Sequence, residues 1–238
     1  ANTMTNIGRG YDVSADPHVT YTTAAGMLPF GIQAAIGYAP NTADGQSNSY
    51  KAGGAQADAD VDGTNATQYK VTASPLDGLK VGADYYEVGG NQASNVSQEK
   101  SGGNYYLQYA MGNFKIGYTK GFVEPGKNTN KYRTNVADTA SALNGLRYES
   151  DGIGIEFAVN DQLSVSFTEE DFDRTNKTMA ATASTATATT VTSSQTTIMA
   201  AYNIGGATLG LSLIDTDNSD YTASRDETKS IISLALAF

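Results

Sequence analysis

The residue types that usually carry chemistry are sparse in this sequence, and their spacing gives few ways to combine them. Cysteine is absent, so there is no thiolate nucleophile, thiolate metal site or disulfide. His18 is the only histidine, and it alternates with Thr20 on the wet face of an expected strand, which does not suit a serine–histidine mechanism. The neighbouring acids Glu169 and Glu170 point to opposite faces of a strand and cannot flank one glycosidic bond. No phosphate-binding glycine motif is present either, and we expect that the chain is not an enzyme.

One acidic run has the spacing of a calcium loop. Asp58, Asp60 and Asp62 precede Gly63 in the pattern D-x-D-x-D-G, and clustered carboxylates are ligands that Ca²⁺ prefers. The twelfth position of such a loop is Tyr69 instead of glutamate, and no flanking helices are expected, which argues against an EF-hand. We expect that no cofactor is required. The acidic run at residues 58–62 is either a weak Ca²⁺ site in an external loop or a solvated acidic loop.

A second group of charged side chains occupies alternate positions in segments whose other residues are apolar. A period of two places neighbouring side chains on opposite faces of a strand, so these charges would share one wet face of a sheet. On the wall of a water-filled passage they would set its preference among ions, whereas the simpler interpretation is that they only keep that face wet. The expected lining residues are Lys70, Lys80, Asp84, Lys115, Arg147, Glu156 and Glu170.

The strands that would position these charges are clearest in the middle of the chain. Apolar residues occupy every second position in three runs: 79–85, 105–111 and 114–118. A two-residue turn would pair Met111 with Phe114, and the preceding turn would pair Ala73 with Leu79. Both registers keep the apolar side chains on one face of the sheet.

The same alternation recurs along the chain and gives about eleven strands, joined alternately by short turns and long polar loops, as is typical of transmembrane barrels. Two places depart from the pattern. Leu146 and Tyr148 lie in the opposite phase to the run that follows them, so we expect a bulge or a strand start near Gly152. The alanine- and threonine-rich segment 179–197 is expected to be mostly a mobile loop.

Composition favours a thin apolar skin over a large hydrophobic core. Hydrophobic residues make up 39% of the chain, with 25 glycines and 15 tyrosines, and no apolar run reaches the roughly 20 residues that a spanning helix needs. The net charge of -10 argues against nucleic acid as a partner. The sequence therefore predicts an all-β fold, a transmembrane antiparallel β-barrel, in a single domain over residues 1–238.

At this point the sequence resembles the general porins of Gram-negative bacteria. The resemblance rests on Gly8 and Arg9 ahead of residues 19–22, on hairpins such as the one that includes 79–86, and on the closing alternation of 232–238. Members of that family end their last strand in an aromatic residue, usually phenylalanine, which the outer-membrane assembly machinery reads. Phe238 would be this assembly signal.

The resemblance implies a homotrimer of sixteen-stranded barrels in the outer membrane, each narrowed by an inward-folded third loop. Residues 1–16 would match the end of that loop, with Arg9, Asp12 and Asp16 at the constriction, and the eleven strands would match strands six to sixteen. Eleven strands alone would leave two unpaired edges in lipid, so the sequence is expected to be a fragment of a longer chain.

The expected function is an outer-membrane channel for passive diffusion of small hydrophilic solutes and ions, with selectivity set by pore size and lining charges. Its expected partners are further copies of itself, membrane lipid and lipopolysaccharide, the assembly machinery and the solutes. The alternative is a non-channel surface protein, an adhesin-like or phage-docking barrel acting through long loops at 41–65, 123–145 and 173–192. A secreted soluble β protein is a further rival, which would have to cover its apolar faces with a core.

Overall fold

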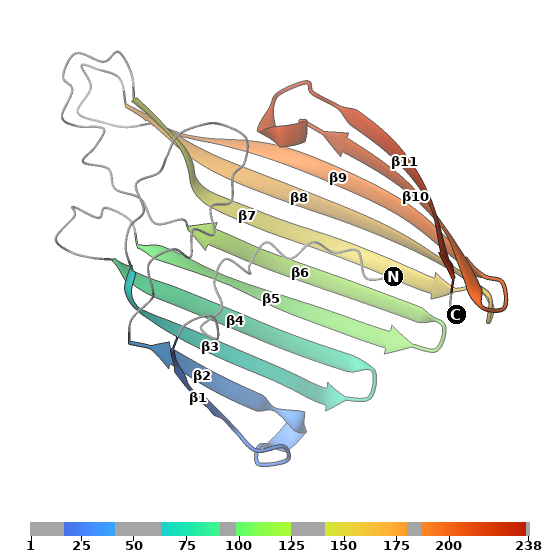
Figure 1. Ribbon diagram of the computed structural model, residues 1–238, viewed down its shortest axis with the longest axis horizontal. Helices are drawn as coiled ribbons and strands as arrows, with labels where there is room; N and C mark the ends of the chain where they lie inside the picture. Colours follow the sequence, from blue (N-terminus) through green and yellow to red (C-terminus); the bar gives the residue numbers. More distant parts are fainter. Residues whose placement is uncertain (1–16, 41–62, 91–98, 125–140, 180–186, 237–238) are drawn as a thin grey trace.

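The computed structural model describes residues 17–40, 63–90, 99–124, 141–179 and 187–236, and every strand in these ranges belongs to one antiparallel sheet (Figure 1). The strands follow one another across the sheet in chain order, with β1 and β11 at its two edges. They are β1 (Val19–Thr22), β2 (Gln33–Ala39), β3 (Gly63–Leu76), β4 (Leu79–Gly90), β5 (Lys100–Met111), β6 (Phe114–Glu124), β7 (Ser141–Ala158), β8 (Leu163–Met179), β9 (Thr187–Asn203), β10 (Ala207–Asp217) and β11 (Glu227–Leu236), with short 3-10 turns η2 (Pro29–Gly31) and η5 (Ser219–Tyr221). The eleven strands and the all-β class expected from the alternation are confirmed.

Tight turns set the register of the central hairpins. Met111 pairs with Phe114 as expected. At the preceding hairpin Ala73 pairs with Val81, and it is Leu76 that pairs with Leu79. The expected register was therefore displaced by two residues, because the register shifts between Ala73 and Leu76, around a proline that has no N–H for the ladder. A displacement of two keeps every side chain on its expected face.

Strand β7 runs without interruption through the place where a bulge or strand start was expected. Its pairing with β8 is continuous from Arg147 to Ala158, and its one register shift lies earlier, between Leu143 and Arg147. The change of phase in the sequence is therefore real, and Tyr148 lies on the opposite face from Ile153.

The threonine-rich segment is mostly strand, which corrects the expectation of a mobile loop over 179–197. Strand β9 begins at Thr187 and pairs with β8 along its length. Threonine favours extended backbone because its branched side chain packs well on a pleated surface. Its hydroxyls also pair across the strands: Thr192 donates to Asp173 at 2.5 Å, and the Thr175 and Thr190 hydroxyls are 3.2 Å apart.

The two faces of the sheet differ in what covers them. One face, here called the apolar face, carries large side chains that stay exposed, among them Leu107 (43%), Phe114 (51%) and Leu211 (51%). The buried hydrophobic cluster in the described ranges holds four residues: Ala39, Ala66, Tyr86 and Val88. All four lie on the opposite face, here called the polar face. No described helical segment is long and apolar enough to cross a membrane.

Two turn glycines provide a matched test of this register. Gly78 has φ +76° and a Cβ placed on it would clash with the Ala110 carbonyl oxygen, whereas Gly112 has φ +57° and open space around it. We expect Gly112→Ala to lower the unfolding free energy by about 1 kcal/mol through backbone strain alone. Gly78→Ala must also displace backbone, so we expect a loss of roughly 3 kcal/mol or more. Urea titration in detergent micelles measures both, and equal losses would contradict the β3–β5 packing.

Candidate functional site

The polar face brings together six of the seven residues expected to line a passage. Register places Lys70 opposite Asp84 and Lys115 opposite Glu156, with the Lys115 Nζ 3.1 Å from a Glu156 carboxylate oxygen. Glu170 lies opposite a glycine of β7 and is 2% exposed. The six are Lys70, Lys80, Asp84, Lys115, Glu156 and Glu170. Ion pairs as open to water as Lys115–Glu156 add little stability, so what these charges contribute is a field along the face.

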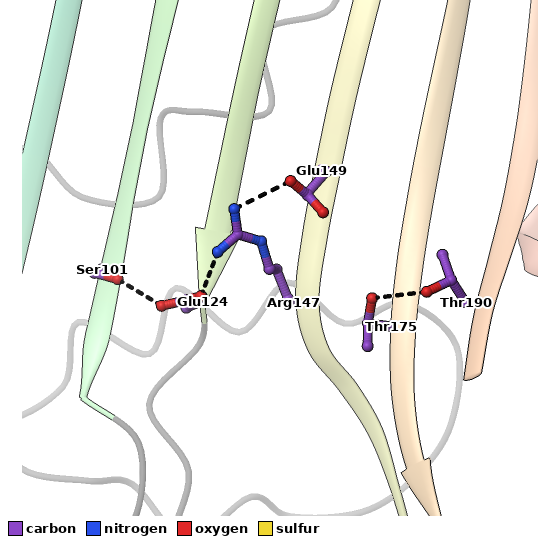
Figure 2. A network of polar contacts seen from close by, with 6 residues as sticks. All are labelled: Ser101, Glu124, Arg147, Glu149, Thr175 and Thr190. Carbon is purple, nitrogen blue, oxygen red and sulfur yellow. Dashed lines mark hydrogen bonds and ion pairs between the residues drawn. The ribbon is translucent and has the colours of Figure 1, made fainter. Parts of the chain in front are cut away.

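Arg147, the seventh expected lining residue, lies on the apolar face. The uninterrupted register of β7 puts it in phase with Ile153, and it binds two carboxylates there. Its Nη1 is 2.6 Å from Glu124 Oε1 and its Nη2 is 3.0 Å from Glu149 Oε1 (Figure 2). Its Cζ lies 4.5 Å from the centre of the Phe122 ring. The expectation failed because the apolar face becomes charged towards the strand ends far from the short turns. Arg147 is thus part of an ion-pair network on the apolar face of the sheet.

The polar face also carries aromatic side chains that alternation did not point to. Tyr86 lies over Gly102 and Tyr106 lies over Gly82, so closely that a Cβ on either glycine would fall within 3 Å of the ring. The signal for this arrangement was the pairing of glycine with tyrosine in neighbouring strands, which becomes readable only once the register is known. These rings narrow the space above the face without adding charge.

Several expected site residues lie outside the described ranges. They are the constriction residues Arg9, Asp12 and Asp16, the acidic run Asp58, Asp60 and Asp62, and the terminal Phe238. Within the described ranges no group of three or more histidine or acidic side chains is placed to hold a metal ion.

The apolar face forms a band with two parallel slanted edges. At the strand ends far from the short turns, the first charged residue on the apolar face is Glu87 in β4 and Asp215 in β10. Following the paired residues from strand to strand across the sheet places Asp215 level with Val81 of β4. This edge therefore moves by six residues over the six strand spacings from β4 to β10.

The edge at the short turns moves by the same amount. Following the paired residues from strand to strand places Leu211 of β10 level with Met111 of β5, which lies two residues beyond the partner of Leu79, the first residue of β4. The first residue of β10, Ala207, lies four residues before Leu211. The start of the strands therefore also moves by six residues between β4 and β10. One residue per strand, at a rise of about 3.3 Å and a strand spacing of about 4.8 Å, corresponds to an incline of about 35°. Strands of transmembrane barrels are tilted by about 35–45° against the membrane normal. An apolar belt that is parallel to the membrane plane would therefore run across such tilted strands at about this angle.

Aromatic side chains stack along both edges of the band. Phe114 and Phe157 stack beside the short turns with ring centres 4.4 Å apart, and Tyr69 and Tyr85 stack near the charged edge at 6.5 Å. Girdles of aromatic residues mark the two interfaces of a transmembrane barrel.

Comparison with known proteins agrees with this geometry at the level of the fold. No family model matches the sequence, and no curated protein sequence is similar to it. Among solved structures, the fold is similar to that of a porin refined at 1.8 Å resolution, with a TM-score of 0.55 and 13% sequence identity. The match covers 92% of this chain and 60% of the porin, so the chain spans about 60% of the length of the structure it resembles. The chain therefore has a porin-like β-barrel fold.

A lysine placed inside the band tests whether the band meets lipid. Leu211→Lys puts a charge on the apolar face well inside its edges, and we expect a loss of about 2–4 kcal/mol when the full chain is unfolded by urea from lipid vesicles. Thr196→Lys, on the same face at the charged edge, should cost about 0–1 kcal/mol. If both variants lose the same free energy, the band does not lie in a bilayer.

Proposed function

We propose that the chain forms part of the wall of a water-filled channel in an outer membrane, through which small hydrophilic solutes and ions diffuse passively. The observation that carries the proposal is the slanted apolar band, whose parallel edges match a level membrane crossed by tilted strands. A soluble sandwich would bury this band against a second sheet, whereas in the described ranges the band stays exposed.

The polar face would then meet water inside the barrel. Backbone groups in lipid must be paired within the protein, so the proposal requires that the outer sides of β1 and β11 pair with further strands in a closed barrel. The porin-like fold supports this closure, and we propose in addition that the protein assembles into trimers and contacts lipopolysaccharide.

Transport through such a passage needs no covalent chemistry. Charges of both signs lie on the polar face. The positive residues are Lys70, Lys80 and Lys115, and the negative residues are Asp84, Glu156 and Glu170. We propose that these side chains set ion preference through their field, and that the space left between them and the tyrosine rings sets the size limit.

Planar-bilayer recording of the full chain tests the channel and its lining together. We expect current steps of uniform size. Lys80→Glu reverses one charge on the polar face, so cation permeability relative to anion permeability should rise by roughly two-fold or more. Lys120→Glu makes the same change on the apolar face and should leave this ratio unchanged.

Two results would count against the proposal. Equal shifts for both variants would contradict the assignment of the polar face to the passage. A chain that inserts into the bilayer without giving steps would favour a surface protein without a channel.

A further inference from the structure

The connection between β10 and β11, residues 218–226, here called the strap, turns back over the polar face. Asn218 Nδ2 donates to the Thr192 carbonyl at 3.1 Å, and Ser193 Oγ donates to the Asp217 carbonyl at 3.1 Å. Ser193 lies on the polar face of β9 and is 7% exposed. These bonds join the first residues of the strap and the end of β10 to strand β9. The strap itself is the connection between the ends of β10 and β11 in Figure 1.

The strap has a defined internal structure. Ser219 N donates to the Arg225 carbonyl at 2.6 Å, Thr222 N to the Ser219 carbonyl at 3.2 Å, and Arg225 N to the Thr222 carbonyl at 3.2 Å. The Asn218 side chain accepts from Ser224 N at 3.0 Å. Hydrogen bonds at this density hold the segment in one shape.

Four non-glycine residues of the strap adopt left-handed backbone. They are Asn218, Asp220, Tyr221 and Ser224, with φ between 50° and 61°. Such conformations persist only where the surroundings determine them, and they gather at sites where shape matters for function. Arg225 also forms exposed ion pairs with Asp220 at 2.7 Å and Glu227 at 3.3 Å, which add little stability.

Tyr221 carries the strap far across the sheet. Its ring centre lies 6.1 Å from that of Tyr148 on β7, and the Arg174 Cζ on β8 lies 4.7 Å from its centre. Strand β8 is two spacings, or about 10 Å, from β10, so the strap extends over β9 as far as the side chains of β8 and β7. A guanidinium over a tyrosine ring is attracted by the ring quadrupole. The Arg174 Nε is buried, and its guanidinium contacts the strap through the cation–π interaction with Tyr221.

We infer that the strap is a fixed constriction of the passage, anchored by Tyr221 between Tyr148 and Arg174, and that it limits the size of the solutes that pass. The inference rests on the proposed channel, since only then does the polar face line a passage. A segment that extends over β9 to the side chains of β8 and β7 takes up cross-section that water and solutes would otherwise fill. Tyr221, Tyr148 and Arg174 are thus size-determining residues that the charge pattern did not indicate.

Cysteine labelling tests the position of the strap, because the chain has no cysteine of its own. Thr222 is an exposed residue of the strap with ordinary φ, and Thr228 is an exposed threonine on the apolar face of β11. We expect a bulky hydrophilic maleimide to reduce the current step of Thr222→Cys by roughly one third or more. The same label on Thr228→Cys should leave the step unchanged.

Two further variants test the anchor. Tyr221→Phe keeps the ring contacts and should give unmodified steps and size exclusion. Tyr221→Ala releases the strap, so the step should grow by roughly 1.2-fold or more and larger neutral polymers should enter.

Each outcome decides between two failures. If the unmodified chain gives uniform steps but neither the label at position 222 nor the loss of the ring changes them, the strap is not a constriction and the channel stands. If the unmodified chain gives no steps, the proposed function fails and the inference fails with it.

Discussion

The pairing of every backbone amide inside one continuous sheet is the constraint on which this structure depends. A strand that crosses lipid has no water to satisfy its N–H and C=O groups, so its neighbours must do so. Strands β2 to β10 meet this requirement on both sides through an unbroken meander in which each strand pairs with the next along the chain, and the outer sides of β1 and β11 require further strands. Once the backbone is satisfied in this way, the side chains are free to sort by face, and a hydrophobic core becomes unnecessary. This accounts for a sheet whose few buried hydrophobic residues lie on its polar side.

Alternation was enough to predict the strands and their faces wherever lipid would touch one side. In the runs 79–85, 105–111 and 114–118 the alternating apolar residues fall on the face that the sequence assigned to them, because neighbouring positions of a strand point to opposite faces. Even where the register was displaced by two residues, at Ala73, the faces survived. The period of two therefore predicts faces more reliably than partners.

In the strand ends beyond the charged edge of the band, alternation of apolar and polar residues no longer distinguishes the two faces of the sheet. There both faces contact polar groups, so Glu149 and Arg147 stand outside while Tyr148 points to the polar side, and the apparent phase is inverted. The strand β9 was missed in its first half for a related reason, since alanine and threonine give no contrast between faces. The contact of Tyr221 with Tyr148 and Arg174 was also beyond the sequence, because it depends on a connection folding across three strands. The charged lining residues were predictable one by one, whereas their spatial relations were not.

The unequal lengths of the strands give the molecule an uneven rim. Strands β7, β8 and β9 are 18, 17 and 17 residues long, while β4, β5 and β6 are 12, 12 and 11. About ten residues suffice to cross a bilayer, so the paired ribbon of β7–β9 stands roughly 20 Å along its strands above its neighbours. Its flank carries hydroxyl groups that contact one another, as between Thr175 and Thr190. In the proposed channel, this ribbon is the part of the described sheet that reaches furthest from the apolar band, and we therefore expect it to present a hydrated surface beyond the membrane.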